Sequence, residues 1–199
     1  RGGDDSRTFG GDFVAGVYPL LPDETCWFLA ADFDEENWAS DAMAMLKTCH
    51  ANGVPAALER SRSGNGGHVW IFFSEPVPAR TARQLGAAML TETMERRPEI
   101  GFASYDRFFP SQDNMPVGGF GNLIALPLQR RARELGNSVF IDEDLRPYKD
   151  QWAFLAAIPR LSVNAAAEIV GDAEMRGRVL GVRMPVEDDP RSGLRLRAE

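Results

Sequence analysis

The hydrophobic pattern near the start of the chain predicts a buried strand followed by an amphipathic helix. Residues 26–34, CWFLAADFD, form a short apolar run that ends in acids, which is typical of a buried strand. Apolar side chains then recur at helical spacing over residues 37–52, and Gly53 ends this helix. The strand therefore carries its terminal acids directly to the beginning of a helix.

A second group of elements follows the same alternation of strand and helix. Residues 55–61 and 68–74 are predicted to form two strands joined by a glycine-rich loop, and residues 79–97 a helix that Pro98 stops. The apolar residues that we expect to face inward on this helix are Ala82, Leu85, Met89 and Met94.

The rest of the chain predicts further strands at 102–109, 122–129 and 138–141, and helices at 151–158 and 164–176. The order of strand, helix, strand, strand, helix, strand, strand is typical of an α+β fold. We therefore expect a mostly antiparallel sheet with helices packed on one face and the other face left for a ligand.

Composition predicts one folded domain with polar ends. The chain has 199 residues, of which 44% are hydrophobic and 10% aromatic, and these values exclude general disorder. We expect a flexible or edge segment at 1–15, a folded domain at 16–184 and a polar tail or linker at 185–199.

The expected location is cytoplasmic, away from any membrane. No apolar run approaches the ~20 residues of a spanning helix, and no secretion leader is visible. Cys26 and Cys49 lie in apolar surroundings and are expected to be free thiols in a reducing compartment. The net charge of −7 argues against a surface coated with DNA-binding charge but is compatible with a local basic groove.

Asp32 and Asp34 are the first candidates for chemistry. Alternation along the strand places both carboxylates on one face and Phe33 on the other. Two such charges repel unless a cation lies between them, and hard oxygen ligands favour Mg²⁺ or Mn²⁺. The simpler alternative is a solvated strand end that caps the next helix.

The second candidate is the glycine-rich turn in residues 59–73, ERSRSGNGGHVWIFF. Glycines allow backbone N–H groups to approach an anion closely, and Arg60 and Arg62 add positive charge. His68, at the first position of the next strand, would point its imidazole at phosphate groups bound by the turn. The alternative is an ordinary hairpin loop with a half-exposed histidine. The turn matches neither the P-loop nor the dinucleotide-binding fingerprint.

The third candidate lies in SYDRFFPSQD, residues 104–113. Asp106 falls on a predicted strand and could reach the face of the first two acids, while Asp113 is an alternative in the following loop. A surface salt bridge is the simple alternative for either residue. The tryptophans lie in apolar runs and are expected in the core rather than as stacking platforms: Trp27, Trp38, Trp70 and Trp152.

Together these motifs resemble the archaeo-eukaryotic primase, or primase-polymerase, superfamily. That superfamily has an acidic D-x-D/E motif at a strand end, a Ser/Gly-rich turn ending in histidine and a later strand aspartate. Over residues 16–157 the chain is most similar to the primase-like domain of TOTE conflict-system proteins. The strings that carry this resemblance are WFLAADFD, ALERSRSGNGGHVWIFFSEPVPA, SYDRFFPSQD, GGFGNLIALPLQ and GNSVFID.

The resemblance implies an RRM-like catalytic core and template-dependent nucleotidyl transfer by two Mg²⁺ or Mn²⁺ ions. It implies that Asp32, Asp34 and Asp106 bind the metals. The residues that would hold the NTP or dNTP are Ser63, Gly64, Asn65, Gly67 and His68, with Arg60 and Arg62 as partners of triphosphate or template.

The resemblance also implies a DNA template and primer as partners, with helicase and nuclease modules in the same full-length protein. The cluster that could follow the template backbone is Arg130, Arg131 and Arg133. Two alternatives stay open. One is a metal-dependent nuclease, which needs no triphosphate site, and the other is a non-catalytic nucleic-acid-binding module on the same fold.

Overall fold

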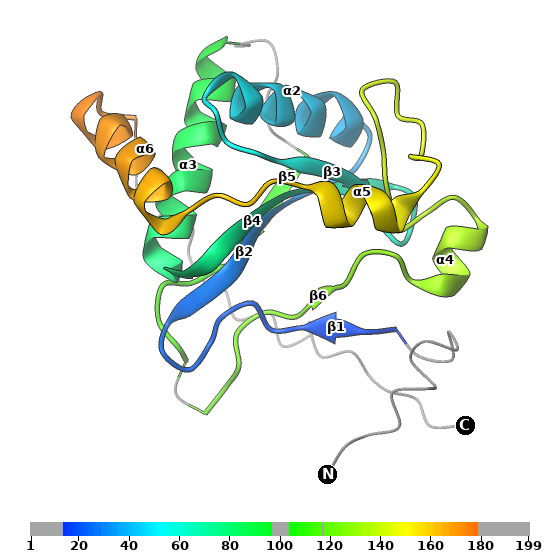
Figure 1. Ribbon diagram of the computed structural model, residues 1–199, viewed down its shortest axis with the longest axis horizontal. Helices are drawn as coiled ribbons and strands as arrows, with labels where there is room; N and C mark the ends of the chain where they lie inside the picture. Colours follow the sequence, from blue (N-terminus) through cyan, green and yellow to red (C-terminus); the bar gives the residue numbers. More distant parts are fainter. Residues whose placement is uncertain (1–13, 97–103, 117, 179–199) are drawn as a thin grey trace.

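A five-stranded antiparallel sheet forms the centre of the protein in the computed structural model, which describes residues 14–96, 104–116 and 118–178 (Figure 1). The strand order is β5-β2-β4-β3-β7. These strands are β2 (Thr25–Asp34), β3 (Ala57–Arg60), β4 (Gly66–Pro78), β5 (Tyr105–Phe109) and β7 (Val139–Phe140). A separate antiparallel pair joins β1 (Gly16–Val17) to β6 (Ile124–Ala125).

Three long helices cover one face of the sheet (Figure 1). They are α2 (Trp38–Ala51), α3 (Ala79–Arg96) and α6 (Val163–Met175). Two short helices, α4 (Arg130–Glu134) and α5 (Gln151–Ala157), lie on the other side of the molecule. The arrangement confirms the predicted α+β class with a mostly antiparallel sheet.

The alternation of side chains along β2 and β4 separates two cores. Leu29, Ala31 and Phe33 face the helices and are buried in the main core. Ala30 and, on β4, Trp70 belong to a smaller core on the opposite face. The buried strand predicted at 26–34 is therefore present, and Phe33 faces the side opposite to Asp32 and Asp34 as expected, since successive strand residues point to opposite faces.

The opposite face of the sheet is only partly open, in contrast to the expectation that it is left for a ligand. Phe154, Leu155 and Ile158 pack from α5 and its C-terminal side against the smaller core, and Ile124 and Leu128 join it from β6 and the segment after it. Large rings on this face require such a cover because exposed apolar area costs free energy. The polar end of β2 lies beyond this cover.

The strand predicted at 122–129 is much shorter in the structure. Only Ile124–Ala125 form β6, and residues 130–134 form the unpredicted helix α4. Pro127 cannot donate to a sheet ladder, and Leu128 has a φ of 67°, so the strand cannot continue.

Three apolar side chains that we expected inside are exposed. Met94 is 47% exposed in the last turn of α3, directly after the last buried residue of this helix, Thr93. Trp27 is 45% exposed at the irregular step in the β2–β4 register between Cys26 and Phe28. Trp152 is 56% exposed on α5, a helix without a buried residue.

Some expectations fall outside the described residues, namely residues 1–13 of the segment expected at 1–15, the stop at Pro98 and the tail at 185–199. Cys26 and Cys49 are free and buried, as predicted, and burial raises the pKa of each thiol to about 12. None of the helices in the described part of the chain has the length and apolar character needed to cross a bilayer.

Candidate active site

Three carboxylates meet at one end of the sheet. Asp32 and Asp34 lie at the end of β2, Asp106 lies on β5, and one oxygen atom of each lies within 4.8 Å of the others. The two strands are antiparallel neighbours, and Phe33 pairs with Tyr105 on the opposite face, where their rings are 5.9 Å apart. The residues that flank this aromatic pair therefore point to the shared open side.

The three carboxylates of this group repel one another. Partial burial raises the pKa of Asp34, and the neighbouring carboxylates of Asp32 and Asp106 raise it further. Such repulsion is relieved when a cation lies among the carboxylates. The set consists of hard oxygen ligands, which Mg²⁺ and Mn²⁺ prefer, so these residues fit a divalent metal site.

His68 connects the carboxylate group to the interior. Strand pairing places it opposite Asp32 on β2 and opposite Glu59 on β3. Its Nε2 atom is 3.3 Å from Oδ1 of Asp32, and its Nδ1 atom is 3.0 Å from Oε2 of Glu59. Burial lowers the pKa of His68, but its bonds to the two carboxylates prevail and raise it to about 10.

Glu59 is a site residue that the sequence analysis missed. It is 1% exposed, and its carboxylate accepts hydrogen bonds from Nε1 of Trp70 at 2.8 Å and from Oγ of Ser138 at 3.3 Å, in addition to facing His68. A buried carboxylate needs such partners. The available sequence signal was an acid that directly follows the apolar residues Ala57 and Leu58 in the predicted strand.

The glycine-rich turn lies directly beside Asp34. Gly64 has a φ of 84°, which only glycine adopts readily, and the backbone N–H of Asn65 donates to Oγ of Ser63 at 3.2 Å. A Cβ atom on Gly66 would overlap Oδ1 of Asp34, and one on Gly67 would lie 2.5 Å from the ring of Trp38. The two glycines therefore allow the turn to touch the acidic strand end and α2.

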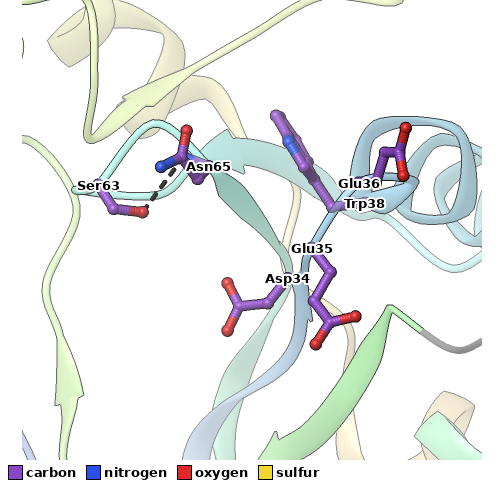
Figure 2. A pocket seen from close by; sticks show the side chains of 6 residues that line it. All are labelled: Asp34, Glu35, Glu36, Trp38, Ser63 and Asn65. Carbon is purple, nitrogen blue, oxygen red and sulfur yellow. Dashed lines mark hydrogen bonds between the residues drawn. The ribbon is translucent and has the colours of Figure 1, made fainter.

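A cavity of about 540 Å³ opens between the turn and the beginning of α2. Figure 2 shows Ser63 and Asn65 on one side and Glu36 and Trp38 on the other, with Asp34 and Glu35 below. Its volume lies within the range of roughly 300–1,000 Å³ that small-molecule sites occupy. A ligand in this cavity would contact both the turn and the carboxylate group.

The two arginines before the turn differ in their surroundings. Arg60 donates from its two terminal nitrogens to the carbonyl oxygens of Gly136, at 2.9 Å, and Leu145, at 2.7 Å. Its guanidinium therefore holds two loops of the chain. Arg62 is exposed on the turn itself.

Asp106 and Asp113, the two alternatives for a third carboxylate, lie in different environments. Asp106 belongs to the carboxylate group and also accepts a hydrogen bond from Nε of Arg107 at 2.7 Å. Asp113 forms an ion pair with Arg83 on α3, with 2.5 Å between the atoms. The geometry thus favours Asp106 as the partner of the two β2 acids.

A second unpredicted contact supports the position of β5. Asp41, on α2, is 1% exposed and accepts a hydrogen bond from Oγ of Ser104 at 2.5 Å. The backbone N–H of Asp34 donates to the carbonyl oxygen of the same serine at 2.7 Å. Ser104 thus ties the beginning of β5 to both α2 and β2, two residues before Asp106.

Comparison with known proteins identifies a family. A family model described as the TOTE conflict system, Archaeo-Eukaryotic Primase domain, matches residues 6–169. No curated protein sequence matches the chain. Among solved structures, the polymerase domain from Mycobacterium tuberculosis ligase D in complex with DNA is similar, with a TM-score of 0.40 and 19% identity over 77% of this chain.

The chain spans about half of that structure, covering 53% of its length. The family model covers most of the chain, including Asp32, Asp34, the glycine-rich turn and Asp106. The resemblance expected from the sequence motifs is confirmed, and the chain belongs to the family of archaeo-eukaryotic primase domains of TOTE conflict systems.

Proposed function

We propose that this domain is a template-dependent nucleotidyltransferase, a DNA primase-polymerase that joins an NTP or dNTP to a nucleic-acid 3′-hydroxyl. The observation that carries the proposal is the cluster of Asp32, Asp34 and Asp106, whose oxygens lie within 4.8 Å of one another beside the glycine-rich turn. Membership of the primase family supports nucleotidyl transfer as the reaction class.

The carboxylate group fits a site for divalent cations because its oxygens are close enough to share them and repel one another without them. Two bound Mg²⁺ or Mn²⁺ ions would lower the pKa of the attacking hydroxyl and neutralise charge on the triphosphate. The protein's part is to hold three carboxylates rigidly, and the β2–β5 pairing and the Ser104 contacts serve this purpose.

The turn and His68 would hold the triphosphate. Ser63 and Asn65, which line the 540 Å³ cavity, offer a hydroxyl and an amide. Gly64 and Gly67 would add glycine backbone from the same turn, and Arg62 adds positive charge. His68 keeps Nδ1 on Glu59 and directs Nε2 to the side of the carboxylates, where it would donate to a phosphate oxygen.

The test is an incorporation assay with primed and unprimed templates, labelled ribo- and deoxynucleotides, and Mg²⁺ or Mn²⁺. Product lengths on a gel show whether the wild-type protein starts or extends chains, and Asp34→Asn serves as the inactive control. Cleavage of the template by the wild-type protein, without incorporation of nucleotides, would favour a metal-dependent nuclease. Template binding that survives Asp34→Asn, with neither incorporation nor cleavage in the wild type, would favour a binding module.

The cavity and turn favour the polymerase over the nuclease, because hydrolysis of a phosphodiester requires no triphosphate site. We also propose that the domain acts beside helicase and nuclease modules of a longer protein, as the family resemblance implies. Co-expression of the domain with the remainder of its chain, followed by affinity capture, would test this association.

A further inference from the structure

A second cavity lies away from the carboxylates, between β4 and α5. Its volume is about 340 Å³. The residues that line it are Phe72, Trp152, Leu155, Ala156, Ile158 and Arg160. Nothing in the reaction proposed above uses this pocket, so its apolar floor and exposed tryptophan require a separate explanation.

The pocket lies on the same face of the sheet as the candidate active site. Phe72, Trp70 and His68 alternate along β4, so all three point to that face, and the rings of Trp70 and Phe72 are stacked with 8° between their planes. Four strand residues span roughly 13 Å. Trp70, between His68 and Phe72, is buried under the smaller core, so an extended strand of nucleic acid that leaves the carboxylate group would pass over this cover and reach the pocket within a few nucleotides.

Trp152 is presented to solvent by a well-anchored helix. Asp150 caps α5 by accepting a hydrogen bond from the N–H of Ala153 at 2.9 Å, and the ring of Phe154 stacks on Tyr148 with centroids 3.8 Å apart. Trp152 itself is 56% exposed. A rigid exposed indole is a suitable platform for stacking, because every nucleobase has a flat aromatic face.

The charges around the pocket are positive. The guanidinium carbon of Arg133 lies 5.7 Å from the centroid of the Trp152 ring, and its buried Nε atom has no hydrogen-bond partner among the described residues. Arg160 contributes the charged part of the lining. A protein with a net charge of −7 therefore places cations around this aromatic pocket, which complements an anionic strand.

We propose that the pocket binds unpaired single-stranded nucleic acid, with a base stacked on Trp152 and phosphates near Arg133 and Arg160. The assignment of this strand as the template rests on the proposed function; the stacking site itself does not. The aromatic floor and the flanking arginines have the composition of sites that bind single strands without sequence preference.

The test measures binding of a fluorescein-labelled oligothymidylate to the whole chain by fluorescence anisotropy, without nucleotide or divalent cation. Trp152→Ala should weaken binding about tenfold, the loss expected for one base stacked on an aromatic ring. Trp152→Phe should restore most of the affinity. Trp27→Ala, which removes another exposed indole that does not line the pocket, should leave the affinity unchanged.

Arg160→Ala should weaken binding and lower the salt slope by about one, the value for one lost phosphate contact. Arg80→Ala, on the exposed side of α3 across the sheet, is the matched control and should change neither the affinity nor the salt slope. Melting temperatures near the wild-type value for all variants would show that the fold is retained.

Unchanged affinity in both Trp152→Ala and Arg160→Ala would overturn the proposal. A second copy of the chain would be the occupant instead if Trp152→Ala converts a dimer to a monomer in sedimentation without changing oligonucleotide affinity. Binding that depends on Trp152 in a protein that incorporates no nucleotide would support the pocket while contradicting the proposed function.

Discussion

His68 and Glu59 face each other across neighbouring strands, with 3.0 Å between Nδ1 of the histidine and Oε2 of the glutamate. The same carboxylate also accepts hydrogen bonds from Trp70 and Ser138. Because the imidazole is held from the interior, its Nε2 atom is directed towards Asp32 and the open side of the sheet. A buried residue outside the acidic group thus sets the orientation of a proposed triphosphate ligand.

Two replacements of Glu59 should separate its effect on the orientation of the His68 imidazole from its effect on the stability of the fold. Glu59→Gln keeps the shape of the side chain but exchanges an acceptor for an amide donor opposite Nδ1, so we expect the KM for nucleotide to rise more than kcat falls. Glu59→Ala leaves three buried donors unpaired and should lower the free energy of unfolding by roughly 3 kcal/mol. Steady-state incorporation and urea denaturation measure the two effects, with Glu168→Gln on the exposed surface of α6 as the control.

Stability should fall with rising pH when no divalent cation is present. The pKa of His68 is raised from 6.5 to about 10, so between these values the native state keeps a proton that the unfolded chain has released. The stabilisation is complete below pH 6.5 and is lost as the pH passes about 10. Urea titrations in EDTA across this window should show the decrease, and His68→Gln should reduce it. An identical slope in the variant would contradict the role of His68.

Removal of the charge of Asp34 should destroy activity without harming the fold. Burial and the neighbouring acids raise the pKa of Asp34, so its charge is less favourable in the folded protein than in the unfolded chain. Asp34→Asn should therefore leave the melting temperature unchanged or slightly higher, while single-turnover incorporation with Mn²⁺ falls by orders of magnitude. Activity close to that of the wild type would show that Asp34 is not a metal ligand.

Asp106→Asn and Asp113→Asn should differ sharply in their rates of nucleotide incorporation. Asp106 lies in the carboxylate group, so its loss should reduce incorporation by at least about 100-fold, the cost of a misplaced catalytic group. Asp113 pairs with Arg83 in a half-exposed ion pair, and its replacement should cost at most about 1 kcal/mol of stability and a few-fold in rate. Single-turnover extension at saturating nucleotide compares them. A silent Asp106→Asn beside an inactive Asp113→Asn would reverse the assignment.

A methyl group at Gly66 should disturb the site locally. Its Cβ atom would overlap Oδ1 of Asp34, so Gly66→Ala should lower the melting temperature and weaken incorporation together. Gly171→Ala in the interior of α6 is the matched control, because a Cβ atom there meets nothing within 4 Å. That variant should gain roughly 0.5–1 kcal/mol of stability from helix propensity and keep its activity. Equal activity in both variants would mean that the turn tolerates a side chain against Asp34.

Local patterns in the sequence predicted the long helices, α5 and most strands of the central sheet, although they missed α4. The apolar run of residues 26–34 predicts a strand, and alternation along a strand places Asp32 and Asp34 on one face. The helical spacing after it predicts α2, and both inferences depend on neighbouring residues alone. The same holds for the hairpin around the glycine-rich turn. The motifs also identified the family, since their long strings include the residues around each candidate site.

Tertiary structure decided which distant residues meet. The choice between Asp106 and Asp113 depends on the pairing of β5 with β2, and the contact of Ser104 with Asp41 joins residues 63 positions apart. Glu59 becomes a partner of His68 only through the register of β3 and β4, and Trp152 is left exposed because α5 turns other side chains to the core. Such contacts follow from strand register and packing between remote segments, which periodicity within one segment does not encode.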